Sequence, residues 1–178
     1  MLSPDALADD TALISAARQG EAEAFAQLFD RYHAMIHAFA FRLCGHAADA
    51  DDIAQEAFIK AGRGMRSFRG GDFRSWLYRI AANCARDFHR DAARRARLEE
   101  RSAEELRGAG EERTGEAARV AEALGALPTE HRETVVLVFF EGLNHAEAAR
   151  VLGCAETTVS WRLFRAKRQL KNLLSRQR

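Results

Sequence analysis

The sequence contains little proline and no long apolar segment. Pro4 and Pro128 are its only prolines, so residues 5–127 hold no residue whose ring would break a helix. The longest unbroken apolar run, Val135–Phe140, is far shorter than the roughly 18 residues that a membrane-spanning helix needs. The start of the chain has no basic segment followed by an apolar one, so no secretory signal is expected. These absences permit long helices and argue against a membrane protein.

Cysteine is scarce as well. Cys44, Cys84 and Cys154 are odd in number and far apart, which argues against a disulfide framework and favours a reducing, cytoplasmic location. The composition, 47% hydrophobic and 30% charged, is that of a chain that folds around a core. Its 178 residues suffice for one ordinary domain or two small ones.

The net charge of +1 conceals a strong segregation along the chain. Residues 1–60 carry 4 basic and 10 acidic groups, and residues 98–116 carry 3 and 7. By contrast, residues 61–97 carry 10 basic and 3 acidic groups, and residues 151–178 carry 7 and 1. Two basic blocks separated by acidic ones indicate two contact sites for a polyanion. The alternative is that these blocks are solvated faces without a partner.

Apolar residues recur at helical spacing in the first half of the chain. One stripe predicts a long helix that ends at Gly45, and another predicts a helix that begins after a cap at Asp72. A helix capped near Asp49 or Asp51 is expected between them, and a shorter helix, at about residues 11–18, precedes them all. The two stripes consist of Phe25, Leu28, Phe29, Tyr32, Met35, Ile36, Phe39 and Leu43, and of Phe73, Trp76, Leu77, Ile80, Ala81, Cys84 and Phe88.

Residues 93–115 are rich in Ala, Arg, Glu and Gly and contain almost no large apolar residue. Such a segment buries little surface, and we expect it to be a flexible linker. Further helices are expected at about residues 117–127, at residues 130–140 and in two segments after that. The sequence therefore predicts an all-α protein with two small helical domains, residues 1–92 and 116–178.

The second of these domains contains the spacing of a helix-turn-helix motif. Ala149 places a small residue where the two helices cross, and Gly153 supplies the positive φ that the tight turn requires. Cys154, Val159 and Leu163 give the second helix an apolar inner face, while its outer face is strongly basic. The pattern predicts a DNA-binding domain, and the alternative is a helical hairpin with a solvated basic face.

The second helix of the motif is the expected recognition helix, which would enter the major groove of DNA. Arg162 and Arg165 are the candidates for base contact because a guanidinium group pairs with the edge of guanine. Lys167, Arg168 and Lys171 are expected to contact phosphates and to position the helix.

Two stretches of the first half resemble segments of bacterial sigma factors. Residues 51–61 (DDIAQEAFIKA) are similar to the helix that binds core polymerase, and residues 68–83 (FRGGDFRSWLYRIAAN) to the adjoining loop and helix that handle the −10 promoter element. The helix-turn-helix domain is similar to the family's −35-reading domain at Leu127–Pro128, Glu141–Leu143 and residues 158–166. From about residue 11 to 174, the chain resembles the small two-domain extracytoplasmic-function (ECF, group IV) sigma factors.

The resemblance implies three contact surfaces on a dissociable specificity subunit of RNA polymerase. The surface for the clamp of the largest polymerase subunit would comprise Asp51, Asp52, Gln55, Glu56 and Phe58. The surface for the melted −10 strand would comprise Phe68, Arg69, Gly70, Arg79, Asn83 and Arg86. The surface for the −35 element would comprise Thr158, Ser160, Trp161, Arg162, Arg165 and Arg168.

Some aromatic residues keep more than one expected role. Trp161 stands where the family usually has a small polar residue, and it is expected to contact a thymine methyl group, to pack against its own domain or to meet a protein partner. Phe73 and Trp76 fall on an apolar stripe and are expected in the core. Tyr78 lies off that stripe, so base stacking and packing both stay open.

Neither a metal site nor a cofactor is expected. His33 and His37 have the one-turn spacing of metal ligands, but Cys44 and His46 lie about two turns further along. The sequence shows no Ser-His-Asp grouping, phosphate-binding loop or paired carboxylates, so the chain is not expected to be an enzyme.

The leading functional interpretation is promoter recognition and −10 opening as a subunit of RNA polymerase. The resemblance also implies control by an anti-sigma factor and a partnership with promoter DNA, without membrane contact of the chain's own. One alternative is a dimeric helix-turn-helix regulator that binds DNA unaided. Another is a sigma-like adaptor or antagonist that binds only protein.

Overall fold

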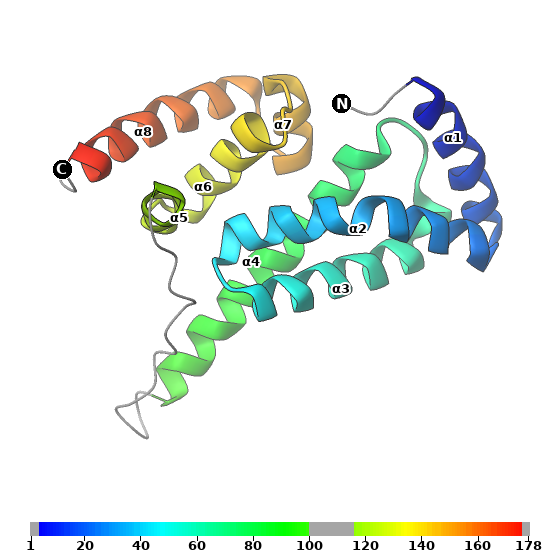
Figure 1. Ribbon diagram of the computed structural model, residues 1–178, viewed down its shortest axis with the longest axis horizontal. Helices are drawn as coiled ribbons and strands as arrows, with labels where there is room; N and C mark the ends of the chain where they lie inside the picture. Colours follow the sequence, from blue (N-terminus) through cyan, green and yellow to red (C-terminus); the bar gives the residue numbers. More distant parts are fainter. Residues whose placement is uncertain (1–3, 100–115, 176–178) are drawn as a thin grey trace.

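The computed structural model describes residues 4–99 and 116–175, and every regular element within them is helical (Figure 1). The predicted all-α class is therefore confirmed. The N-terminal helices are α1 (Pro4–Gln19), α2 (Ala22–Cys44), α3 (Ala47–Gly64) and α4 (Phe73–Glu99), with a 3₁₀ turn at Met65–Ser67. The C-terminal helices are α5 (Glu116–Gly125), α6 (Thr129–Val135), α7 (His145–Leu152) and α8 (Glu156–Ser175), with a π-helical turn at Val136–Phe140. No helix in these ranges has the length and apolar character to cross a bilayer.

Helix α2 is the central element of the N-terminal group (Figure 1). Most of its predicted apolar stripe is buried, and Leu28, Ile36 and Phe39 are fully enclosed, but Phe29 at the edge of the stripe is 36% exposed. Burial of each such side chain contributes about 1.5–3 kcal/mol. The helix ends where Gly45 adopts a left-handed conformation, with φ of 85°, and donates its N–H to the carbonyl of Phe41.

Helix α1 is longer than the predicted segment 11–18 and begins at Pro4. It packs along α2, to which it is tied by a buried carboxylate. Asp10 accepts hydrogen bonds from the Arg31 guanidinium and the Tyr32 hydroxyl of α2. Helical periodicity alone did not predict this attachment because it depends on a polar contact between two helices.

The cap at Asp72 was predicted correctly, whereas the cap at Asp49 or Asp51 was wrong. The Asp72 carboxylate accepts the backbone N–H of Arg74 at 3.2 Å and of Ser75 at 3.0 Å, which satisfies two of the free donors at the start of α4. Helix α3 begins at Ala47 instead, after His46 in extended conformation. Its first turn buries Ala50 against the core, so tertiary packing extends the helix past the predicted caps.

Helix α4 continues to Glu99 and so includes the first seven residues of the predicted linker 93–115. The remainder of that linker lies outside the described residues. The expected helix 130–140 is α-helical up to Val135 and π-helical from Val136 to Phe140. Glu141, the residue after this segment, donates its N–H to the carbonyl of Val136 at 3.0 Å, five residues back, and the wider turn buries both Val136 and Leu137.

The helix-turn-helix is present as predicted. A capping box starts α7: the Asn144 side chain accepts the N–H of Glu147, and the Glu147 carboxylate accepts the N–H of Asn144. Gly153 ends α7 with φ of 66°, and Ala149 is buried at the crossing with α8. Val159 is fully enclosed and anchors α8.

The two groups of helices pack against each other rather than lying apart. Helices α6 and α7 lie over the side formed by α2 and α4, and α8 lies outside them (Figure 1). One continuous apolar core joins Phe39 and Tyr78 of the N-terminal group to Val136 and Leu137 of the C-terminal group. The two groups of helices therefore share a buried apolar interface.

Candidate nucleic-acid and partner interfaces

The outer face of α3 is acidic, as the sequence predicted. Asp51, Asp52, Gln55 and Glu56 all lie exposed on this one helix. Its inner face buries Ile53, Ala54 and Ala57, which fixes the rotation of the helix and turns the carboxylates outward. Such a face suits a basic partner, because acidic rims steer the association of oppositely charged surfaces.

An apolar groove runs beside the acidic face, and the sequence did not single it out. Its volume is about 520 Å³, and it lies between α2 and α3. Phe29 and Ile59 are 36% and 40% exposed there, whereas Phe58 is buried beneath and meets Phe29 edge-to-face at 4.8 Å. The groove is lined by Phe25, Phe29, His33, Asp51, Gln55, Phe58, Ile59 and Gly62. Phe25 and Phe29 were assigned to the core stripe, because periodicity does not distinguish a helix's covered face from a flanking uncovered strip.

The histidines of α2 face the same acidic helix. His37 lies 3.1 Å from the Asp51 carboxylate, and the His33 and His37 rings are stacked at 6.2 Å. Within the two described ranges, no group of three or more His, Cys, Asp or Glu side chains is placed to hold a metal ion.

The loop between α3 and α4 forms one wall of a shallow pocket of about 470 Å³. Gly70 and Gly71 have φ of 93° and 95°, and no other atom approaches the positions where their side chains would begin. The backbone here is therefore open to close approach by a ligand. The pocket is lined by Ser67, Phe68, Arg69, Gly70, Gly71, Asp72, Ser75, Trp76, Arg79 and Arg150.

The aromatic residues near this pocket support it from inside. Phe68 is only 5% exposed and packs against Phe73 and Trp76, so its ring is not available to a base in this arrangement. Phe73 is buried, as expected, and Trp76 packs partly buried against it. Of the residues predicted in this loop, Arg69 and Gly70 are exposed.

Helix α4 carries the remaining residues predicted for the −10 strand. Arg79 and Asn83 are exposed on it, about one turn apart. Arg86, one further turn along, is only partly exposed and is engaged within the chain. Its guanidinium lies 3.0 Å from the Glu133 carboxylate of α6 and also donates to the carbonyl of Ala82.

Glu133 itself is buried, with a side chain 3% exposed. Burial disfavours the charged form and raises the pKa of this carboxyl to about 7, and the neighbouring Arg86 opposes the shift. Burial together with the hydrogen bond to Glu141 raises the pKa of the Tyr78 hydroxyl, so this hydroxyl stays protonated and donates. Tyr78, whose role the sequence left open, is thus a buried residue packed against Phe39.

Helix α8 presents an outward face of polar, basic and aromatic residues. Ser160, Trp161, Arg165 and Arg168 are exposed on it, and Thr158 is half-buried near its start. The hydroxyl of Ser160 lies 3.1 Å from the imidazole Nδ1 of His145, so α7 fixes the position of this side chain.

Arg162 differs from the other arginines of α8. Its guanidinium donates to the Glu130 carboxylate of α6 at 2.5 Å, and its side chain is 13% exposed. A second nitrogen faces the sulfur of Cys154 at 3.9 Å. Arg162 therefore ties α8 to α6 in this structure, and the sequence signal for a base contact did not distinguish it from Arg165.

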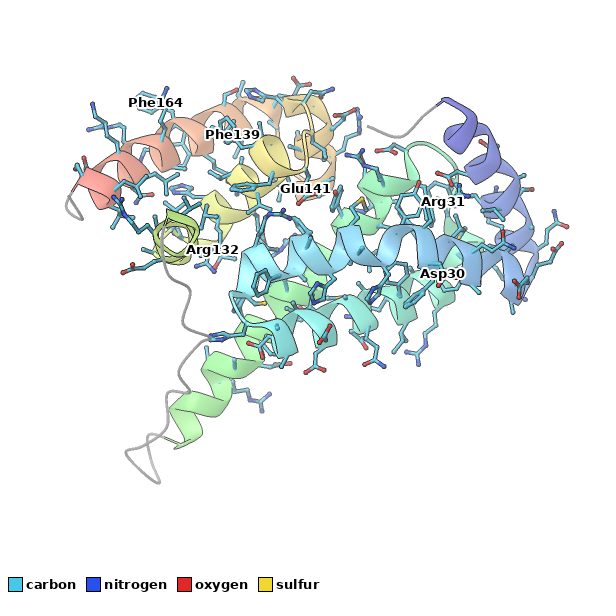
Figure 2. All side chains as sticks on the ribbon, in the orientation of Figure 1. Asp30, Arg31, Arg132, Phe139, Glu141 and Phe164 are labelled. Atoms are coloured by element: carbon cyan, nitrogen blue, oxygen red, sulfur yellow. The ribbon has the colours of Figure 1, made fainter. Side chains whose placement is uncertain are left out.

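The same face of α8 carries two exposed aromatic side chains, Trp161 and Phe164. Trp161 is 55% exposed, meets the ring of His131 edge-on at 5.8 Å and lies beneath the Arg165 guanidinium at 5.6 Å. Phe164 is 59% exposed and lies beneath Arg168 at 5.8 Å (Figure 2). Phe164 was not among the predicted contact residues, although its exposed apolar ring is as available to DNA as that of Trp161.

Two family models match the chain, one in each group of helices. The family model for Sigma-70 region 2 matches residues 28–95, and that for Sigma-70, region 4 matches residues 117–170. The ECF RNA polymerase sigma factor SigM of Mycobacterium tuberculosis is 38% identical over 169 residues, which cover 93% of this chain and 84% of that protein. The RNA polymerase sigma factor CnrH of Cupriavidus metallidurans is 36% identical over 182 residues, which cover 93% and 94% of the two chains.

Solved structures resemble most of the chain. CnrH in complex with the cytosolic domain of CnrY superposes with a TM-score of 0.71 at 36% identity, covering 94% of this chain and 97% of that one. The sigma factor RpoE in complex with the anti-sigma factor NepR from Bartonella quintana gives a TM-score of 0.68 at 27% identity, covering 86% and 98%.

Proposed function

The chain belongs to the ECF RNA polymerase sigma factors. We propose that three of its surfaces, which bind core polymerase, the −10 strand and the −35 element, together direct core polymerase to promoters. The observation that carries the proposal is the presence on one chain of an acidic helix, a glycine-containing loop pocket and a basic helix-turn-helix. We assign the first two to a domain of residues 1–92 and the third to a domain of residues 116–178.

The acidic face of α3 is assigned to docking on the clamp of the largest polymerase subunit. Asp51, Asp52, Gln55 and Glu56 supply the charge, and the adjacent groove above Phe58 supplies apolar surface. Charge complementarity would steer the encounter, and the apolar groove would contribute the burial that holds the complex.

The loop pocket and the outer face of α4 are assigned to the melted −10 strand. Arg69 and Gly70 border the pocket, Arg79 and Arg86 are placed to follow phosphates, and Asn83 offers an amide that both donates and accepts. Turning a base out of the stack costs a few kcal/mol. A surface that binds the open strand better than the duplex shifts the equilibrium towards opening without covalent chemistry.

The outer face of α8 is assigned to the −35 element. Arg165 is the exposed arginine nearest the start of the helix and is placed for a guanine edge, while Arg168 and the side chains of Thr158 and Ser160 contact the backbone or neighbouring bases. The ring of Trp161 is assigned to an apolar contact such as a thymine methyl group.

Regulation by an anti-sigma factor is part of the proposal. CnrH and the Bartonella RpoE share the fold across most of this chain, and they were solved in complex with the cytosolic domain of CnrY and with the anti-sigma factor NepR. We further assign the chain to the cytoplasm, where the polymerase acts, and to a purely binding role without catalytic activity.

Electrophoretic gel shifts with and without core polymerase test this proposal. The expected result is that the purified chain alone binds a promoter duplex weakly, and that the chain with core enzyme gives a specific, promoter-dependent complex. Tight and specific binding by the chain alone would favour a stand-alone regulator instead. Failure to join core enzyme in any promoter complex would favour a protein antagonist.

A further inference from the structure

Trp161 contacts side chains on two different helices. Its indole meets the imidazole of His131, on α6, edge-on, with the ring centroids 5.8 Å apart. On α8 itself, the guanidinium of Arg165 lies over the indole, 5.6 Å from the ring centroid. Because the indole is 55% exposed, its position depends on these two contacts rather than on enclosure in a core.

His131 gives the indole a fixed neighbour. This residue is 9% exposed, and its imidazole Nδ1 lies 3.1 Å from the side-chain oxygen Oε1 of Gln169, which is about two turns beyond Trp161 on α8. A side chain held by both packing and a hydrogen bond positions the group that it touches more closely than a solvated side chain does. The indole therefore packs against a fixed part of the C-terminal helices.

The contact with Trp161 restricts Arg165 before DNA is bound. A long arginine side chain has many rotamers, and it loses that freedom when it binds one partner in one geometry. Attraction between the guanidinium and the indole face removes part of this freedom in the free chain. Less conformational entropy is then lost on binding, which raises the affinity of the contact.

This contact restricts the guanidinium without occupying its donors. An aromatic face attracts the positive charge, whereas the N–H groups at the edge of the guanidinium stay available for hydrogen bonds. Arg162 shows the opposite case, because its guanidinium donates to the Glu130 carboxylate. Of these two arginines on α8, Arg165 is therefore the one that is both oriented and able to donate to DNA.

We propose that Trp161 is a positioning residue for Arg165, whose guanidinium it orients towards the O6 and N7 atoms of one guanine in the −35 element. The inference rests on the proposed function, which assigns α8 to that element and Arg165 to a guanine edge. It adds a second role to the apolar contact assigned to the same indole. It also explains a tryptophan where a small polar residue is usual in the family, since a small side chain offers no aromatic face.

Two substitutions at one position separate an aromatic face from apolar bulk. Trp161→Leu keeps an apolar side chain but removes the face, whereas Trp161→Phe keeps a smaller face. The matched control is Phe139→Leu in the π-helical turn, which removes another exposed ring of the C-terminal helices (Figure 2). Trp161 and Phe139 are 55% and 70% exposed, so all three variants should fold as the wild type does, which circular dichroism verifies.

The probe is a promoter duplex in which each −35 guanine in turn is replaced by 7-deazaguanine, which lacks the N7 acceptor. Competition gel shifts with holoenzyme, assembled from core polymerase and the full chain, give the loss of affinity for each replacement. The guanine read by Arg165 is the one at which the wild type loses affinity and Arg165→Ala does not. This comparison fixes the position at which the Trp161 variants are measured.

At that guanine, we expect the wild type to prefer the natural base by about tenfold, since 7-deazaguanine loses one hydrogen bond of a bidentate contact. Trp161→Leu should lower this preference by a factor of about two to five, the contribution of an exposed cation–π contact. Trp161→Phe should keep most of the preference, and Phe139→Leu should keep all of it. Full preference in a folded Trp161→Leu variant would overturn the proposal, and so would equal losses in Trp161→Leu and Trp161→Phe.

A double-mutant cycle shows whether Trp161 acts through Arg165. It uses a duplex whose −35 thymines are replaced by uracil, which lacks the methyl group, so that an apolar contact of the indole with thymine is absent. On this duplex Trp161→Leu should still lower the affinity of the wild-type chain. In an Arg165→Ala chain it should lower the affinity no further, because the group that the indole positions is already missing. Additive losses would show that the indole acts independently of Arg165 and would contradict the positioning role.

The same gel shifts separate this inference from the proposed function. Suppose that the wild-type holoenzyme binds the promoter specifically and that Arg165→Ala abolishes the preference at one guanine. If Trp161→Leu then leaves that preference intact, the positioning role is wrong and the function stands. If the wild-type holoenzyme binds promoter and unrelated duplexes alike, the proposed function itself is wrong.

Discussion

Arg165 and Arg162 are equivalent by sequence pattern but not in the folded chain. Arg162 is held by Glu130, whereas Arg165 is exposed above Trp161. We expect Arg165→Ala to weaken −35 binding by about 1–3 kcal/mol, the value of one bidentate arginine–guanine contact. Competition gel shifts of the holoenzyme with intact and −35-altered duplexes measure this loss.

The substitution Arg165→Ala should affect −35 recognition but not binding to core polymerase. Binding of the variant to core polymerase should equal that of the wild type, and Arg63→Ala, which removes an exposed arginine from α3, should leave −35 discrimination intact. An Arg165→Ala holoenzyme that still discriminates between the two duplexes as the wild type does would exclude Arg165 as a base-reading residue.

Asn83 stands exposed on α4, about one helical turn beyond Arg79, which lines the loop pocket. We expect Asn83→Ala to reduce promoter opening by about tenfold, since an amide that both donates and accepts is lost from the strand-binding face. Initial binding of the closed promoter duplex should change little. Permanganate reactivity of −10 thymines, compared with gel-shift affinity, separates the two steps, and an equal loss in both would contradict a role in opening.

The free energy of unfolding of the chain should depend on pH through Glu133. Burial raises its pKa to about 7, so the folded chain binds this proton more tightly than the unfolded chain does. The stabilising contribution of the protonated carboxyl is complete below the ordinary Glu pKa of 4.5 and is lost as the pH rises to about 7. Glu133→Gln cannot ionise and should avoid this loss.

Urea unfolding at two pH values measures the effect of Glu133→Gln. The free energy of unfolding of the variant, relative to the wild type, should grow by about 2 kcal/mol from about pH 5.5 to about pH 8. The exposed carboxylate of Glu23 supplies the comparison through Glu23→Gln. A relative stability of Glu133→Gln that is constant over this range would show that the folded chain does not hold the proton more tightly.

The positions of some aromatic residues could be predicted from the sequence, and those of others could not. The packing of Phe73 and Trp76 against the core could be predicted because both fall on an apolar stripe. The burial of Tyr78 could not, since the group that satisfies its hydroxyl, Glu141, is 63 residues away in the chain. Phe68 was predicted at the DNA surface from its motif, but its ring packs inward because a loop beside a pocket needs apolar support.

At the scale of the element, α3 is assigned the core-polymerase contact through its charge. We expect the double reversal Asp52→Lys and Glu56→Lys to lower affinity for core enzyme by at least tenfold, because two attractive charges become repulsive ones. Both residues are exposed, so the fold should persist. Fluorescence titration of labelled chain with core enzyme measures the loss, with Glu23→Lys on α2 as the matched reversal, and unaltered affinity would refute the docking assignment.

Element ends were predictable where the chemistry is local. Gly45 and Gly153 end their helices in left-handed conformation, and Asp72 caps α4 through its own carboxylate, so each signal lies within a few residues of its effect. The early start of α3 and the π-helical turn at Val136–Phe140 depend on burial against other helices. Periodicity within one segment carries no information about such neighbours.

At the scale of the whole molecule, the two groups of helices and their order followed from the sequence, but their contact did not. A segment poor in apolar residues predicted separate domains. The structure instead joins them through one core and through Glu141, which meets Arg42 across 99 residues of sequence. Contacts at such separation arise from matching surfaces, and no local pattern in either surface specifies the match.

The three assigned surfaces together describe a subunit that acts within a larger assembly. In the proposed function, the exposed acidic face of α3 binds core polymerase, and the loop pocket and α8 bind the two promoter elements.

The central claim is that this chain confers promoter specificity on core polymerase. Run-off transcription with purified core enzyme and sequencing of the transcript 5′ ends tests it most directly. The account predicts RNA that begins at defined start sites, each preceded by a shared pair of −10 and −35 sequences, only when the chain is present. Transcripts with scattered start sites, or none above those of core enzyme alone, would contradict it.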